Sequence, residues 1–213
     1  MNRQSTIAFS AASVLTLLLA CPVEAQVPRD RTLIVAQGFD PQTLWPNGTT
    51  ASDNVNAGMP MVEPLLGFDT VTNKPVPHLV ERWEMTSPTA IKLSLRKGVT
   101  FSNGEAFDAE AVIHSLKIFT DAKTTPAYSR YAAPLKEFEK LDAHTVVVHT
   151  HFPYPALEMV LTQVYVTPPG YWSQAGGADG FGRKPIGTGP FRFVEWIKDS
   201  LTDHCPLLQY YRS

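Results

Sequence analysis

The sequence predicts an α/β fold, with a mixed β-sheet packed against helices, and three segments carry this prediction. They are an alternating strand at Ala90–Arg96, a helix that begins after Asp108, and a strand rich in β-branched residues at Thr145–His151. Strands and helices follow one another irregularly, which favours a sheet with helices over an all-β or all-α fold. The 18 prolines are scattered, and this argues against a helical bundle.

Composition places the chain among globular proteins. Of its 213 residues, 44% are hydrophobic and 18% are charged, which excludes a disordered chain. The 18 basic and 20 acidic side chains give a net charge of −2. This balance lacks the basic excess of a nucleic-acid-binding protein, so we expect no nucleic-acid partner.

Residues 1–25 are predicted to be a signal peptide. Arg3 precedes an apolar stretch at Ile7–Ala20, and the small residues Val23 and Ala25 indicate cleavage before Gln26. The apolar stretch is too short to remain as a membrane anchor, so we expect an exported protein in the periplasm.

A lipid anchor is the alternative for this N-terminus. Leu18–Cys21 resembles a lipobox, which would make Cys21 the acylated residue. Pro22 and the good cleavage site at Ala25 favour a signal peptide that is cleaved before Gln26 over a lipid anchor at Cys21. Cleavage there leaves Cys205 as the only cysteine, and an internal disulfide is then excluded.

The first part of the mature chain predicts one strand, one loop and one helix. Thr32–Ala36 is a short apolar run typical of a buried strand, and the polar segment Gln37–Asn54 indicates a loop. Met59–Leu66 can form a short helix, although Pro60 and Pro64 limit its regularity.

The best-defined helix follows the Ala90–Arg96 strand. Asp108 is suited to cap it, and Glu110 lies in the first turn, where the helix dipole favours an acid. Val112, Leu116 and Phe119 follow at the spacing of one helical face, so we expect them to pack on the sheet.

Later segments predict smaller elements. A short helix is expected from about Pro155, a flexible glycine-rich stretch at Gly176–Gly189, and a last strand at Phe191–Ile197.

Several segments, in their order along the chain, carry a family resemblance. They are Glu63–Leu65, Pro77–Trp83, Leu93–Phe101, Asn103–Val112, Pro153–Pro155 and Pro185–Phe191. Together they resemble the family 5 extracytoplasmic solute-binding proteins, which are receptors for oligopeptides, dipeptides, nickel and related solutes. The segments form strands, turns and a capped helix, so they identify a scaffold and not a reaction centre.

The resemblance implies the type II periplasmic-binding-protein fold, with two lobes that enclose the ligand. We expect residues 26–200 to be a partial N-terminal lobe, so the first lobe is incomplete. Residues 201–213 depart from the family pattern, and we hypothesise that they are out of frame. The chain is therefore interpreted as a truncated fragment of a peptide-importer component, and we expect it to be non-functional alone.

The resemblance also implies partners and a binding site. The partners would be a peptide or peptide-like solute and the permease subunits of an ABC transporter in the inner membrane. Aromatic rings and the guanidinium of Arg130 suit such a solute, because they offer contact area and a carboxylate partner. The candidate ligand-binding residues are Gln37, Phe39, Thr49, Thr50, Tyr128 and Tyr131.

Enzymatic and metal-binding alternatives have weaker support. A secreted hydrolase would need a nucleophile and base, and no Gly-x-Ser-x-Gly motif occurs. His149 and His151 could share a metal ion, as in a nickel-type receptor, but no third ligand is evident. We therefore predict no catalytic residue, no metal site and no cofactor. Glu137 and Glu139 are interpreted as part of a solvated charged face.

Overall fold

The computed structural model describes residues 40–197 and 209–210. The predicted signal peptide, the predicted strand Thr32–Ala36, and the candidate residues Gln37 and Phe39 lie outside the described residues. So does the 201–213 tail, apart from its two residues in a strand. All the described residues belong to one compact unit, residues 35–213.

The main sheet has four antiparallel strands in the order β3-β4-β6-β5. Their bounds are Val80–Ser87 for β3, Ala90–Leu95 for β4, Leu135–Asp142 for β5 and Thr145–Thr150 for β6. Two hairpins, β3–β4 and β5–β6, join where β4 pairs with β6, with Leu93 opposite Val146. Both predicted strands, at Ala90–Arg96 and Thr145–His151, are confirmed. The α/β class is confirmed as well, with the strands paired antiparallel.

Helix α2 (Ala109–Thr120) packs against this sheet, as the sequence predicts. The Asp108 carboxylate accepts hydrogen bonds from the amides of Glu110 and Ala111, at 2.9 and 3.1 Å. These bonds satisfy two of the amides that a helix N-terminus leaves without partners. Leu116 and Phe119 are buried in the same core as the sheet residues Leu93 and Val146.

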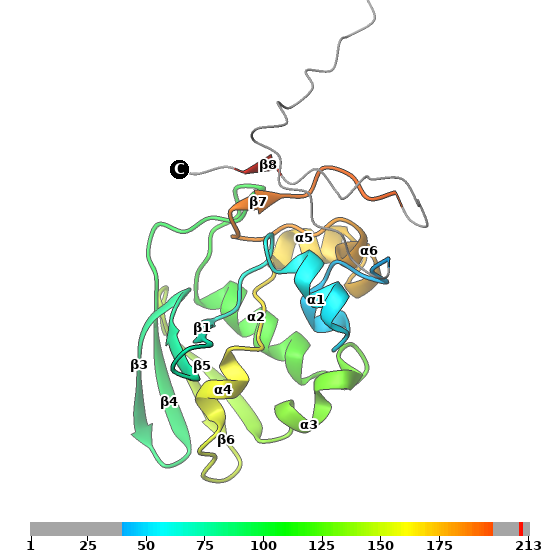
Figure 1. Cartoon of the computed structure of the whole chain (residues 1–213). Helices are drawn as coiled ribbons and strands as arrows, with labels where there is room; N and C mark the ends of the chain where they lie inside the picture. The colour runs from blue at the N-terminus through cyan, green and yellow to red at the C-terminus, as the bar shows by residue number, and fades with distance from the viewer. Residues whose placement is uncertain (1–39, 198–208, 211–213) are drawn as a thin grey trace, which may run out of the picture. The chain divides into compact units, whose positions relative to one another are not determined.

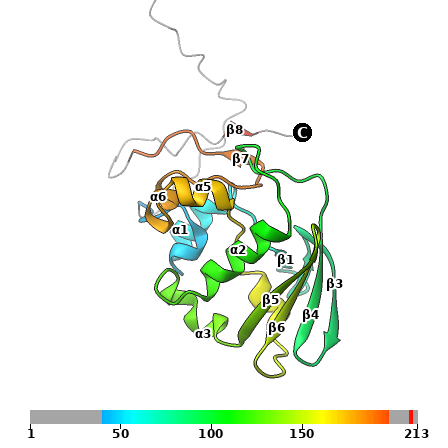
Figure 2. The same cartoon turned by 180° about the vertical axis from the view of Figure 1, so that it is seen from behind.

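The remaining elements surround the four-stranded sheet and helix α2. They are η2 (Pro46–Gly48), α1 (Ser52–Gly58), β1 (Leu66–Asp69), β2 (Lys74–Pro77), η3 (Pro126–Tyr128), α3 (Ser129–Ala132), α4 (Leu157–Leu161), α5 (Pro169–Gln174), α6 (Ala178–Arg183), β7 (Phe191–Arg192) and β8 (Gln209–Tyr210). Helices α1, α5 and α6 lie on the side of α2 away from the sheet (Figures 1 and 2). They cover a second apolar core that includes Leu44, Trp45 and Phe181.

The predicted helix at Met59–Leu66 is wrong. Leu66 begins β1, and the Leu65 amide donates to the Val164 carbonyl at 2.9 Å, far along the chain. Pro64 has no amide hydrogen, so a helix over this segment would lose one of its internal bonds there. Pairing with a distant segment satisfies the backbone instead.

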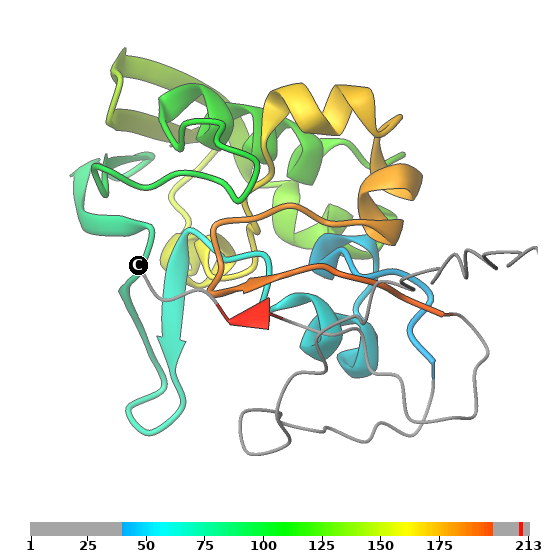
Figure 3. The same ribbon diagram turned by 90° about the horizontal axis from the view of Figure 1, so that it is seen from above.

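Three other predictions need correction. The glycine-rich stretch contains α6, which follows two glycines of positive φ, Gly176 and Gly177. The predicted loop Gln37–Asn54 ends earlier, because α1 begins at Ser52. Only the first two residues of the predicted strand Phe191–Ile197 form β7, which pairs with β8 (Figure 3). The short helix expected near Pro155 is confirmed as α4.

Within the described part of the chain, none of the helices has both the length and the apolar character needed to cross a bilayer.

Candidate functional site

A hollow of about 540 Å³ lies among the segments that carry α1, α3 and α4, which are labelled in Figure 1. We call it the tyrosine hollow, because Tyr128, Tyr131 and Tyr154 are among its lining residues. Thr50, just before α1, and Met159, in α4, line it as well. Its volume falls in the range of small-molecule binding sites.

Tyr128 is buried and holds the loop beside the hollow. Its hydroxyl donates to the carbonyls of Pro46 and Thr49, at 3.3 and 3.2 Å. Burial raises the pKa of Tyr128 above its ordinary value. The two hydrogen bonds fix the ring in the wall of the hollow.

Asn47 fixes the same loop from the other side. Its Nδ2 donates to the Gln163 carbonyl at 2.6 Å, and its Oδ1 accepts from the Tyr165 amide at 3.0 Å. The side chain is buried, and both ends of its amide are engaged. Asn47 therefore has a structural role in this loop, which places Thr50 at the hollow.

Arg130 places a positive charge against Tyr131, one of the residues that line the hollow. Its guanidinium carbon lies 4.6 Å from the centroid of the Tyr131 ring, and Nη2 donates to the Tyr131 hydroxyl at 2.6 Å. Arg130 is exposed, and it forms no ion pair with the residues that the structure describes. A carboxylate of a bound solute could therefore approach the remaining donors of the guanidinium fork.

The structure brings three of the predicted ligand-binding residues together. Thr50, Tyr128 and Tyr131 all line the tyrosine hollow. Thr49 lies beside it: its carbonyl accepts from Tyr128, and its hydroxyl accepts from the Ala51 amide at 3.2 Å.

Sequence reasoning missed Tyr154 and Met159. Tyr154 stands in a Pro-Tyr-Pro segment that was noted only for the family resemblance. Met159 is 40% exposed, on the face of α4 opposite the buried residues Leu157 and Leu161. An exposed methionine on a helix whose other side is buried is a signal that could have found it.

The segments that carry the family resemblance meet at a different place. Glu63 Oε1 lies 3.1 Å from His78 Nε2, and Arg96 Nε donates to the His78 carbonyl at 3.0 Å. Burial raises the pKa of Glu63, but the hydrogen bond from His78 and the charges of His78 and Arg96 outweigh it, so the pKa is lowered. The Gly189 amide donates to the Met61 carbonyl at 3.0 Å beside this cluster. These contacts join distant segments, in agreement with a scaffold role.

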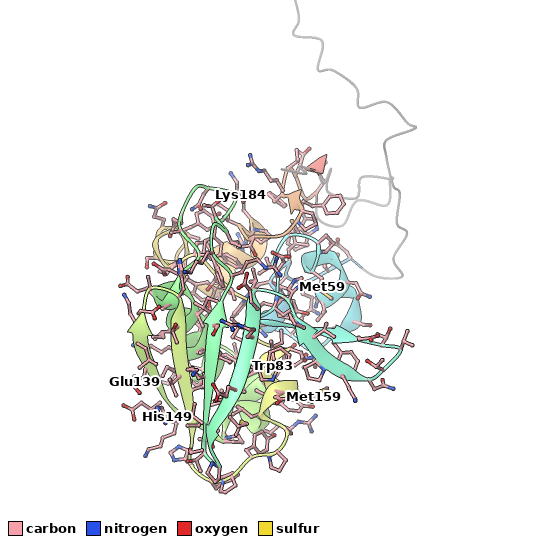
Figure 4. All side chains as sticks on the ribbon, turned by 90° about the vertical axis from the view of Figure 1, so that its left-hand side faces the viewer. Met59, Trp83, Glu139, His149, Met159 and Lys184 are labelled. Carbon is pink, nitrogen blue, oxygen red and sulfur yellow. The ribbon has the colours of Figure 1, made fainter. Side chains whose placement is uncertain are left out.

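The two histidines considered for a metal do not form a centre with other described residues. His149 Nε2 lies 3.4 Å from Glu139 Oε2 on the neighbouring strand, and Figure 4 labels both residues. His151 lies beyond the end of β6 and is exposed. No group of three or more potential ligands occurs among residues 40–197. Glu137 and Glu139 are exposed on β5, as expected for a charged face.

Comparison with known proteins identifies a family model that matches residues 74–202, more than half of the chain. Its description is "Bacterial extracellular solute-binding proteins, family 5 Middle". The fold agrees with a solved structure, NikZ from Campylobacter jejuni in complex with Ni(L-His). The TM-score is 0.67 at 26% identity, over 81% of this chain and 34% of that one.

Two curated relatives match most of the chain. The glutathione-binding protein GsiB of Pectobacterium atrosepticum is 28% identical over 87% of this chain and 35% of its own length. Di/tripeptide-binding protein 2 of Pseudomonas aeruginosa is 27% identical over 95% of this chain and 43% of its own length. The chain spans about two fifths of the length of the curated relatives that it matches.

Proposed function

Because the chain belongs to the family 5 bacterial extracellular solute-binding proteins, we propose that it is part of the substrate-binding component of an ABC importer for peptides or peptide-like solutes. We expect the chain alone to bind such a solute only weakly and to be non-functional in import, since it spans about two fifths of the length of its relatives. Relatives that bind di/tripeptides and glutathione support this solute class. The observation that carries the proposal is the tyrosine hollow, with Arg130 over the ring of its lining residue Tyr131 and without an ion-pair partner among the described residues.

The chemistry of the hollow suits a short peptide. The rings of Tyr128, Tyr131 and Tyr154 offer flat apolar surface, and Arg130 offers a partner for a carboxylate. Gln37, Phe39 and Thr49 remain proposals for the same site, on the family resemblance.

Binding of this kind makes and breaks no covalent bond. We propose that the protein acts in the periplasm and releases the solute to permease subunits in the inner membrane. A family of solute-binding proteins is not a family of enzymes. A peptide incubated with the protein should accordingly be recovered intact.

The proposal is tested by following backbone amide NMR shifts of the purified chain during titration with the dipeptide Ala-Ala. We expect shifts clustered at Thr50 and Tyr131, with a Kd of about 1 mM, which corresponds to about −4.1 kcal/mol. The hollow is open to solvent, so tight binding is not expected. Micromolar peptide should therefore give no thermal shift, because stabilisation requires a ligand concentration near Kd.

A matched pair of arginine variants gives the control. Arg130→Gln should weaken binding severalfold through the lost carboxylate contact, whereas Arg82→Gln should not. Arg82 is also exposed but lies on β3, outside the hollow. Amide shifts scattered over the surface, or equal affinity in both variants, would contradict the proposal.

A second candidate cargo is a metal complex, and the likeness to NikZ with Ni(L-His) favours it. Titration with nickel and L-histidine separates the two candidates. If nickel is the cargo, the backbone amide signals of residues around the tyrosine hollow should broaden. This should occur at a lower concentration of the nickel complex than the concentration of dipeptide needed to shift them.

A further inference from the structure

None of the described residues that line the tyrosine hollow has a charged side chain. The guanidinium of Arg130 lies over the ring of Tyr131, with its carbon 4.6 Å from the ring centroid. Val55 and Met159 add aliphatic and thioether surface to the three tyrosines.

Two of the three tyrosine hydroxyls in the walls have partners within the protein. The Tyr128 hydroxyl donates to the carbonyls of Pro46 and Thr49, and the Tyr131 hydroxyl accepts from Arg130. The Tyr128 hydroxyl hydrogen is therefore already engaged within the protein, and both tyrosines offer ring surface to a solute.

The rim extends this apolar surface. Tyr154 meets Phe152 edge to face, with 6.3 Å between the ring centroids, and Phe152 is 53% exposed. An aromatic or thioether side chain entering the hollow would contact both rings and Met159.

We infer that the tyrosine hollow receives an uncharged, aromatic or thioether side chain of the solute and discriminates against acidic and basic side chains. This inference rests on the proposed function and names the solute class. A charged side chain would lose hydration with no counter-charge among the described residues that line the hollow. A lysine side chain would also be repelled by Arg130, and a glutamate side chain would compete with the solute's terminal carboxylate for it.

The test is a series of dipeptides that differ in one side chain: Ala-Phe, Ala-Met, Ala-Lys and Ala-Glu, with Ala-Ala as reference. Affinities come from the amide shifts of Thr50 and Tyr131 in the purified chain. We expect Ala-Phe and Ala-Met to bind at least about tenfold more tightly than Ala-Lys and Ala-Glu, as burial of one large apolar side chain allows.

The outcomes separate this inference from the proposed function. If all five dipeptides shift the same amides with equal affinity, the proposed function stands and the inference is wrong. If none of them shifts the amides around the hollow, both fail.

A pair of methionine variants provides an independent check. Met159 in the hollow and Met59 outside it are 40% and 44% exposed, and Figure 4 labels both. Met159→Lys should weaken Ala-Phe and strengthen Ala-Glu, each by severalfold, while Met59→Lys should change neither. An unchanged preference in a folded Met159→Lys protein would overturn the inference. If that variant fails to fold by circular dichroism, the dipeptide series on the unaltered chain decides.

Discussion

The carboxylate of Glu105 joins two segments that lie 65 residues apart. Its Oε2 accepts from the Gly170 amide at 2.8 Å, and its Oε1 accepts from the Tyr171 amide at 2.9 Å. Both amides belong to the first turn of α5, where helix geometry leaves them without internal partners. Glu105 therefore caps this helix from a distant turn.

Gly170 fits beneath that carboxylate because it has no side chain. A Cβ at this position would lie 2.8 Å from Glu105 Oε2, which is closer than van der Waals contact allows. Glu105→Ala should cost about 2 kcal/mol, the upper range for loss of a helix cap. Gly170→Ala should cost about 1 kcal/mol, because the Glu105 carboxylate must shift and so weaken its hydrogen bonds to the two amides.

The double variant gives the decisive number. Once Glu105 is alanine, the clash is absent, and Gly170→Ala should stabilise the chain by about 0.5–1 kcal/mol through helix propensity. The coupling energy in a double-mutant cycle should then be about 1.5–2 kcal/mol, measured by urea unfolding followed by circular dichroism. Glu81→Ala, at an exposed position on β3, is the control and should stay within about 0.5 kcal/mol of the unaltered chain. If the free-energy costs of Glu105→Ala and Gly170→Ala simply add in the double variant, the contact between these two residues would be refuted.

Three further predictions concern stability. Because the pKa of Glu63 is lowered in the folded chain, its contact with His78 stabilises the fold above the ordinary carboxyl pKa, and this contribution is lost as the pH falls below about 4.3. The free energies of unfolding of the unaltered chain and of Glu63→Gln, plotted against pH, should thus converge in acid and diverge near neutrality. A difference that does not change with pH would contradict this contribution of Glu63. Tyr128→Phe should cost about 1–2 kcal/mol in urea unfolding, because two buried carbonyls lose their donor; a cost near zero would mean that the bonds contribute nothing. Leu93→Ala, in the core, should cost about 2–5 kcal/mol, whereas Val71→Ala, 88% exposed, should be close to neutral; similar costs would contradict the assigned burial.

Local patterns predicted the elements whose sequence shows one clear face. The alternation in Ala90–Arg96 and the Asp108 cap each depend on residues close in the chain, and both are confirmed. Strand β5 escaped prediction, because six of its eight residues are exposed and most are charged. It is a strand because it pairs with β6, and pairing with a neighbouring strand is a tertiary effect that overrides local propensity.

The candidate site likewise contains some residues that local sequence patterns indicated and others that they did not. Tyr128 and Tyr131 are three residues apart and drew attention as an aromatic pair beside Arg130. Tyr154 and Met159 reach the same hollow from a segment more than twenty positions later in the chain. Their proximity is created by the packing of α4 near α3, and no spacing in the sequence encodes it.

The central claim is that a peptide-like solute binds in the tyrosine hollow, and photo-crosslinking tests it most directly. A dipeptide of alanine and p-benzoylphenylalanine, irradiated with the purified chain, should label Met159, and excess Ala-Phe should protect that residue. Met59 and Met85, which are exposed to a similar degree at 44% and 45%, should remain unlabelled. Equal labelling of the three methionines, or labelling of Met159 that Ala-Phe does not reduce, would contradict the account.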